Sequence, residues 1–285
     1  MVAALSGCSS PGRPSDQTRH ASYERIQSLF TTNQQDVLRQ TYVVFSGDED
    51  FQMSTLESKT GEFAETSKSK TINRGLAIGI ETDGYLMTAG HVLRAKTFVL
   101  GWFDGRIDSR PARVVFRSNF KRPADVVVLK VEGKLNHSAI FSDKPQVGEQ
   151  VLAVACYYKS GEMGGVIDFA GGTVDGVVEG PTGSSVDLIN TDVPLWRGDS
   201  GGPLISGDGK LIGIFTEYNY WWRGFRQKWR TTFFKPDKEF IQSLIARDRA
   251  SANKSPEPTG SSASVQSVTP VAGRTADCRW LSFGR

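Results

Sequence analysis

Ser200 lies among glycines in the segment Gly198-Asp199-Ser200-Gly201-Gly202-Pro203. A serine hydroxyl is a poor nucleophile at neutral pH, so it needs a base, a group that orients this base, and donors that bind an oxyanion. Glycine beside the serine tolerates a sharp turn, so the N–H groups of Gly198 and Ser200 can converge on one point. The same composition also marks Gly-Pro turns between strands. The choice between a nucleophile and a turn depends on whether partner residues exist.

His91, one of three histidines in the chain, has the surroundings of a catalytic base. It follows the apolar run 85–89, so we expect it just past the end of a strand. Asp125 opens the β-branched run 126–131, where its carboxylate can be partly buried and still reach an imidazole. Taken singly, the histidine would be a packed strand-end residue and the aspartate a turn residue. Together with Ser200 they supply base, orienting acid and nucleophile.

The chain order of these three residues discriminates between two folds. Residues 198–202 also fit G-x-S-x-G, the nucleophile elbow of α/β-hydrolases, but that fold places its histidine after the serine. No histidine follows Ser200. The order His91, Asp125, Ser200 is the trypsin-like one.

The segments around the three residues resemble HtrA-type (Deg-like) trypsin-fold peptidases. The matching blocks are residues 83–92, 125–131 and 191–204, the last followed by 211–214. The resemblance covers residues 41 to 246 and implies an all-β fold of two six-stranded antiparallel β-barrels with the active site between them. Two departures stand out: such enzymes often carry Asn where this chain has Asp199, and they usually continue into a PDZ domain, which we do not expect here.

The residues and the resemblance together predict a serine endopeptidase that acts on protein or peptide substrates through an acyl-enzyme, in extracytoplasmic protein processing or quality control. His91 would take the Ser200 proton, Asp125 would fix the imidazole tautomer, and the N–H groups of Gly198 and Ser200 would bind the oxyanion. The alternative is a catalytically latent trypsin-like fold that serves as a binding scaffold, with its oxyanion loop collapsed or its cleft plugged by residues 47–74. The complete triad and the intact glycines favour the peptidase.

Specificity is predicted by family position. Leu195, with Pro194 before it, should line the primary pocket, and Ile214, Phe215 and Thr216 should pair with the substrate backbone as an added strand. An apolar pocket without a fixed acid predicts aliphatic or small side chains before the cut. The aromatic and basic run 218–234 is either a ligand or membrane-interface surface or an aromatic hairpin packed on the barrel.

Composition narrows the remaining possibilities. The 285 residues, 38% of them hydrophobic, can bury the core of one protease unit with tails. A net charge of +3 is no argument for nucleic acid as a partner, and no apolar run reaches the length of about 18 residues typical of a membrane span. No Cys-x-x-Cys or His-x-x-x-His spacing occurs, so neither a metal nor another cofactor is predicted. Cys156, in the apolar run 151–155, is predicted to be a buried free thiol.

The N-terminus carries a second motif. Leu5-Ser6-Gly7-Cys8 resembles a bacterial lipobox, in which the cysteine is lipidated, although only seven residues precede Cys8 and none is basic. Either the start lies inside a longer signal peptide of a periplasmic or cell-envelope protein, or the match is chance in a cytoplasmic chain. The polar stretch 9–18 resembles a tether and favours the first interpretation.

We therefore divide the chain into a signal remnant and linker (1–21), a trypsin-like domain (22–249) and a disordered Ser/Pro/Thr-rich tail (250–285). Apolar spacing predicts an N-terminal amphipathic helix over 22–39, with Ser22 as N-cap, and a C-terminal helix over 237–249. Residues 47–74 are interpreted as a long mobile loop. The sequence does not indicate the oligomeric state. Evenly spaced strands are predicted at 41–45, 76–80, 97–102, 112–117, 126–131, 151–157, 166–169, 173–178, 185–190, 203–205 and 211–216.

Overall fold

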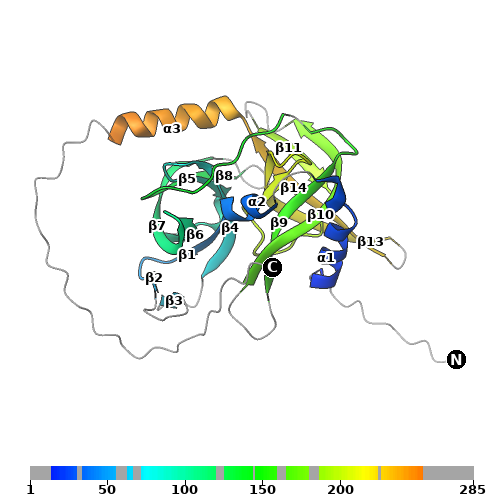
Figure 1. Cartoon of the computed structure of the whole chain (residues 1–285), viewed down its shortest axis with the longest axis horizontal. Coiled ribbons are helices and arrows are strands. Elements are labelled where there is room, and N and C mark those ends of the chain that lie inside the picture. The colour runs from blue at the N-terminus through cyan, green and yellow to red at the C-terminus, as the bar shows by residue number, and fades with distance from the viewer. Residues whose placement is uncertain are drawn as a thin grey trace, which may run out of the picture.

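The chain forms two closed β-barrels with helices outside them (Figure 1). Each barrel has six antiparallel strands, which confirms the predicted all-β fold. The computed structural model describes residues 14–30, 34–55, 63–66, 72–119, 125–143, 145–158, 165–179, 186–223 and 226–252.

The first barrel has the strand order β1-β4-β5-β8-β7-β6. Its central strands are β5, which is mostly apolar, and β8, which is rich in valine, and both faces of each are buried except at Lys130. A short hairpin of β2 and β3 lies beside this barrel, where a loop was predicted; Met53 and the preceding Phe51 pack against the core and explain why this part is ordered. The strands are β1 (Thr41–Gly47), β2 (Gln52–Thr55), β3 (Phe63–Thr66), β4 (Asn73–Glu81), β5 (Tyr85–Ala89), β6 (Lys96–Phe103), β7 (Arg106–Arg117) and β8 (Val126–Val131).

The second barrel has the strand order β10-β11-β14-β13-β12-β9. The two strands predicted over 166–178 are one long strand, β10, whose pairing with β11 shifts register between Val174 and Gly176. Strands β13 and β14 form a hairpin that extends beyond the short β12. The strands are β9 (Gln150–Tyr158), β10 (Gly165–Glu179), β11 (Val186–Thr191), β12 (Pro203–Ile205), β13 (Leu211–Arg223) and β14 (Arg226–Pro236).

The N-terminal helical region differs from its prediction. Instead of one helix over 22–39, it contains α1 (Asp16–Glu24), a 3₁₀ turn (Gln27–Leu29) and α2 (Gln34–Gln40). Ser15, not Ser22, is the N-cap of α1, because its side chain accepts a hydrogen bond from the Thr18 N–H at 3.1 Å. Phe30 then adopts an extended conformation, which ends the helical path.

The C-terminal helix α3 (Lys238–Ala252) confirms its prediction. Its buried face, formed by Ile241, Leu244 and Ile245, belongs to a core cluster that also contains residues of both barrels. Among the helices that the structure describes, none is both long enough and apolar enough to span a bilayer.

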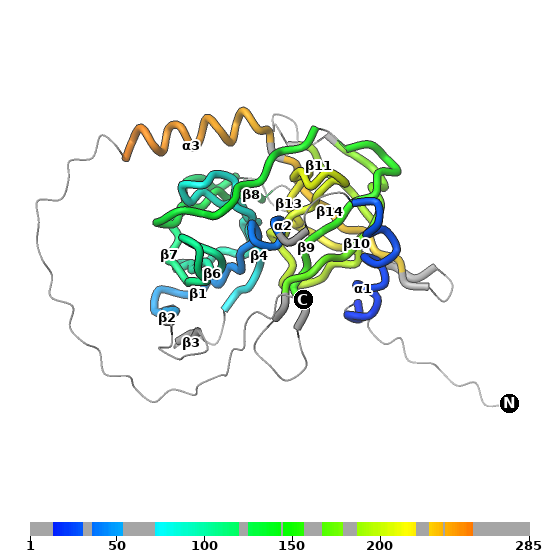
Figure 2. Tube along the Cα trace, in the orientation of Figure 1, coloured from blue at the N-terminus to red at the C-terminus, as the bar shows by residue number. Residues whose placement is uncertain are grey.

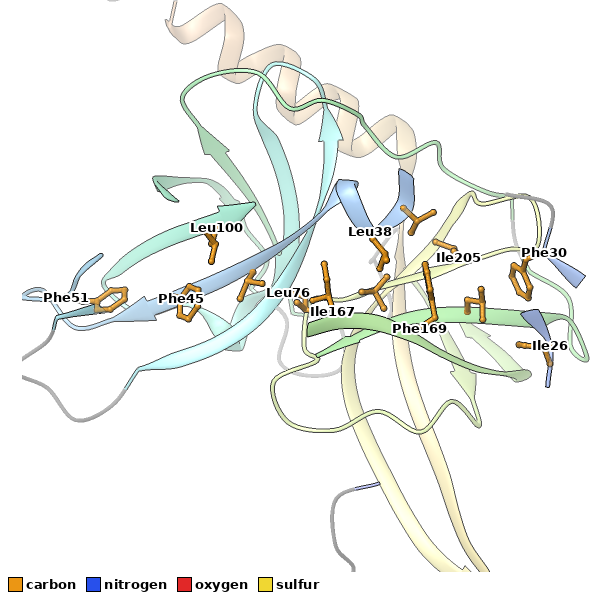
Figure 3. Packing of buried hydrophobic residues seen from close by; sticks show 14 residues of the cluster. Ile26, Phe30, Leu38, Phe45, Phe51, Leu76, Leu100, Ile167, Phe169 and Ile205 are labelled. Atoms are coloured by element: carbon orange, nitrogen blue, oxygen red, sulfur yellow. The ribbon is translucent and has the colours of Figure 1, made fainter. Parts of the chain in front are cut away.

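One apolar cluster joins the two barrels and the N-terminal segment. Figure 3 shows Phe45 and Leu76 of the first barrel continuing into Ile167 and Phe169 of the second, with Ile26 at the far end. In Figure 2 the chain runs from α1, beside β10, through α2 to β1. The N-terminal segment therefore contacts the second barrel before the chain enters the first.

Candidate active site

His91 lies where the predicted strand ends. Strand β5 is fully buried and finishes at Ala89, and His91 follows in a single 3₁₀ turn (Gly90–Val92). The backbone of Gly90 holds this turn: its N–H donates to the Asp125 carbonyl at 2.5 Å, and its carbonyl accepts from the Arg117 guanidinium at 3.0 Å. The backbone just before the histidine is therefore fixed to β7 and to the residue that precedes β8.

Asp125 orients the His91 imidazole. Its Oδ2 accepts one hydrogen bond from the His91 backbone N–H and one from Nδ1, each at 2.7 Å. Because an ionised carboxylate only accepts hydrogen bonds, Nδ1 carries the hydrogen, and the neutral ring keeps Nε2 free to accept a proton. Asp125 is 7% exposed. This is the arrangement that a general base requires.

Backbone contacts from both barrels fix Ser200. Its carbonyl accepts from the Leu76 N–H of β4 at 2.7 Å, while Gly201 donates to Phe215 of β13 at 2.8 Å. Gly201 has φ +86°, and a Cβ there would lie 1.9 Å from the Leu76 carbonyl oxygen. Only glycine fits beside the serine at this junction.

The two predicted oxyanion donors are the backbone N–H groups of Gly198 and Ser200. Gly198 has φ +96°, in the left-handed region that favours glycine. Within the described part of the chain, the N–H groups of Gly198 and Ser200 donate no hydrogen bond to the protein. Both donors are therefore available to a bound group.

One cleft of about 1020 Å³ contains His91, Ser200 and Gly198. No hydrogen bond joins the His91 ring to the Ser200 hydroxyl among the described residues. Bonds of this kind often tighten only in the substrate complex. The remaining lining residues are Ile72, Asn73, Arg74 and Val92 from the first barrel, and Arg197, Thr216, Glu217, Tyr218, Asn219 and Tyr220 from the second.

The predicted substrate-binding residues separate into two groups. Thr216 lines the cleft, but the side chains of Leu195, Ile214 and Phe215 are fully buried in the core and do not. The Phe215 backbone is also engaged, because its N–H donates to Gly202 and its carbonyl accepts from Gly201. These three side chains fill the core of the second barrel and its contact with the first barrel. A substrate strand that pairs with β13 must therefore use positions beyond Phe215.

An aromatic cluster borders the cleft at the base of the β13–β14 hairpin. The ring of Trp196 lies 4.6 Å from that of Tyr218 and 6.0 Å from that of Trp229, measured between centroids, and Tyr218 stacks on Tyr220. Tyr218 and Tyr220 also line the cleft. The hairpin is therefore packed on its own barrel and exposed to a ligand at the same time. The aromatic run is evident in the sequence, but its place in the cleft of Ser200 is not.

The sequence also led to predictions for two cysteines and for metal binding. Cys156 is buried and free, as predicted. Cys8 lies outside the described residues. Among the residues that the structure describes, no group of three His, Cys, Asp or Glu side chains could hold a metal ion.

Two six-stranded antiparallel barrels, with a hydrogen-bonded His–Asp pair and a glycine-flanked serine in one cleft, define the trypsin-like peptidase fold. Residues 75–214 match the family described as trypsin-like peptidase domain. This stretch of the chain is therefore similar to the trypsin-like peptidase domain.

Several curated proteins are similar to this domain. A probable periplasmic serine endoprotease DegP-like of Pseudomonas savastanoi pv. phaseolicola is 30% identical over 152 residues, 51% of this chain and 29% of that protein. The serine endoprotease DegS of Haemophilus influenzae is 30% identical over 151 residues, 50% of this chain and 41% of that protein. The magnetosome formation protease MamE of Magnetospirillum gryphiswaldense is 28% identical over 160 residues, 54% of this chain and 20% of that protein.

The match therefore spans less than half the length of each of these relatives. Among solved structures, the crystal structure of Deg5 covers 78% of this chain and 91% of that chain, at 19% identity and a TM-score of 0.48.

Proposed function

We propose that this chain is a serine endopeptidase that hydrolyses peptide bonds in proteins through His91, Asp125 and Ser200. The observation that carries the proposal is the Asp125 carboxylate bound to Nδ1 of His91, in a cleft that also holds Ser200. The names of the relatives support the same class of activity.

In the proposed reaction, the Ser200 Oγ attacks the peptide carbonyl carbon while His91 Nε2 takes its proton. The carbonyl oxygen becomes an oxyanion, which the N–H groups of Gly198 and Ser200 bind; each such donor is worth about 3 kcal/mol in the transition state. The imidazolium then returns the proton to the departing amine, which leaves an acyl-enzyme. Water, deprotonated by the same histidine, releases the acid and restores the serine. Asp125 stays ionised and stabilises the imidazolium.

The cleft suits an extended polypeptide. Strand β13 continues past the end of β12, so its edge beyond Phe215 is open to an added strand next to Ser200. Thr216 and Tyr218 line this part of the cleft. We propose that the substrate backbone runs here, and, following the relatives named periplasmic, that the enzyme acts in the cell envelope.

The test uses the full chain, a Ser200→Ala variant and a Ser243→Ala variant, since Ser243 is exposed on α3. Each is incubated with a fluorophosphonate probe and with casein, and labelling is read by intact mass. We expect one label on the wild-type and on Ser243→Ala, none on Ser200→Ala, and casein cleavage that follows labelling. A wild-type protein that neither labels nor cleaves would refute the peptidase and leave the binding scaffold.

A further inference from the structure

A fully buried ion pair lies directly behind the nucleophile. Arg19 of α1 and Asp199, the residue before Ser200, have side chains that are 1% and 0% exposed. The guanidinium Nη2 lies 2.8 Å from Asp199 Oδ2, and Nη1 lies 3.5 Å from Oδ1. The two residues are 180 positions apart in the chain. The triad chemistry described above uses neither of them.

Asp199 connects the pair to the nucleophile loop (Trp196–Ser200). Its Oδ2 accepts from the Trp196 N–H at 2.7 Å, and its backbone N–H donates to the Trp196 carbonyl at 3.1 Å. These two bonds close a tight turn around Gly198. The position of one oxyanion donor therefore depends on where the Asp199 carboxylate is held.

The same pair fixes this loop to β9. Asp199 Oδ1 accepts from the Cys156 N–H at 2.7 Å, and Arg19 Nη1 donates to the Cys156 carbonyl at 3.1 Å. Burial raises the pKa of the Asp199 carboxyl, and the charge of Arg19 and the N–H donors of Cys156 and Trp196 act in the opposite direction. Without the guanidinium, the carboxylate would lose the main group that keeps it ionised and in place.

The docking of α1 on β10 places Arg19. The Gly171 N–H of β10 donates to Ser22 Oγ at 3.0 Å, and Ser22 Oγ in turn donates to the Arg19 carbonyl at 2.6 Å. Tyr23 stacks on Phe169 with ring centroids 5.7 Å apart. The docked helix α1, which precedes both barrels in the chain, therefore positions Arg19 beside the nucleophile loop.

We propose that Arg19 is a positioning residue for the nucleophile loop: from α1 it holds Asp199, and through Asp199 it keeps Gly198 and Ser200 in the geometry that acyl transfer requires. For catalysis, the proposal rests on the proposed function. Its structural part, that Arg19 orders the loop, can be tested whether or not the enzyme is active. Because guanidinium does not deprotonate in proteins, the Arg19 charge persists at every physiological pH.

The experiment compares three full-length variants. Arg19→Met removes the charge, Arg19→Lys keeps it with poorer geometry, and Ile26→Ala weakens the same N-terminal segment without touching Asp199; Ile26 is buried and packs near Gly171. Fluorophosphonate labelling is measured over a range of probe concentrations. Amide hydrogen exchange is followed in the peptide that contains residues 196–202.

We expect Arg19→Met to lower the maximal labelling rate by about 100-fold or more, the scale of one lost oxyanion donor, with little change in the probe concentration that gives half the maximal rate. Exchange in the 196–202 peptide should rise to near that of an unstructured loop. Arg19→Lys should recover at least part of both signals, and Ile26→Ala should keep both close to wild-type.

Two results would overturn the proposal. One is equal protection from amide hydrogen exchange in the 196–202 peptide of Arg19→Met and wild-type. This result would refute the ordering role of Arg19 even if the chain never reacts with the probe. The other is an equal loss in Ile26→Ala and Arg19→Met, which would assign the effect to helix docking alone. Absence of labelling in wild-type, with exchange that still depends on Arg19, would refute the peptidase and keep the positioning role.

Discussion

Helices α1 and α3 both form ion pairs with the barrels, but the pair of α1 is buried and those of α3 are partly exposed. Helix α1 reaches the second barrel through the buried pair Arg19–Asp199. Helix α3 reaches the first barrel through Asp248, which pairs with an Arg113 side chain that is 50% exposed, and through Arg249, which is 47% exposed and pairs with Asp83. The buried pair lies one residue from Ser200, whereas α3 makes no contact with the cleft among the lining residues described.

Solvent exposure determines how much each ion pair can contribute to stability. An exposed pair is worth about 0–1 kcal/mol, because water competes for both charges. A buried pair has no such competition, and removing one partner leaves an uncompensated charge. We infer that α3 is held chiefly by its apolar face, and that α1 carries a polar contact that fixes a geometry.

The largest expected effect is that of Asp199→Ala. It leaves the buried Arg19 guanidinium without its carboxylate and should lower the free energy of unfolding by about 3–5 kcal/mol, as measured by urea denaturation. Asp208→Ala is the control, since Asp208 pairs with Lys210 on an exposed turn of the same barrel; we expect a loss of about 1 kcal/mol or less. Similar losses in both variants would remove the distinction between buried and exposed pairs.

A smaller effect is expected when α1 is pushed away from β10. A Cβ on Gly171 would lie 2.5 Å from the Ser22 carbonyl oxygen, so Gly171→Ala should cost about 1–3 kcal/mol of stability. It should also slow labelling of Ser200, because Arg19 moves with the helix. Gly176→Ala on the same strand is the matched control, since a Cβ there meets nothing within 4 Å. Normal labelling in Gly171→Ala would show that the docking of α1 does not influence the reactivity of Ser200.

The sequence was sufficient for the residues whose signals are local. His91 follows an apolar run and Asp125 precedes a β-branched run, and both runs predict strands. The glycines around Ser200 predict a tight loop. The chain order of these three residues favoured a trypsin-like fold, and the structure has two barrels, with His91 and Ser200 in one cleft and Asp125 hydrogen-bonded to His91. Their catalytic roles stay predictions until the labelling experiment is done.

The sequence could not predict the Arg19–Asp199 pair. Helix α1 is polar, so nothing in its pattern distinguishes a buried arginine from an exposed one. The cationic partner of Asp199 is 180 positions away in the chain. In the same way, Leu195, Ile214 and Phe215 look no different in sequence from cleft residues, because strand alternation alone does not say which face closes the barrel.

The smallest expected effect is that of Asp248→Asn, which tests the exposed side of the comparison. Hydrogen bonds from Arg113 and Tyr85 hold the pKa of the Asp248 carboxyl below its usual value. A carboxyl whose pKa is lower in the folded than in the unfolded chain stabilises the fold above its unfolded pKa of about 3.9, and this contribution is lost as the pH falls through the folded pKa. The variant should therefore be less stable than wild-type by about 1 kcal/mol at pH 7, and the difference should shrink as the pH falls below about 3.9.

Stability is measured by urea denaturation across this pH range, with labelling of Ser200 followed at pH 7. Because α3 does not reach the nucleophile loop, labelling of Asp248→Asn should stay within about two-fold of wild-type, inside the roughly 0.5 kcal/mol expected of a change away from the site. A stability difference that does not shrink as the pH falls below about 3.9 would mean that Asp248 acts through packing and not through its charge. Labelling as slow as that of Arg19→Met would show that the exposed pair also controls the serine, and the two helices would then differ in burial but not in role.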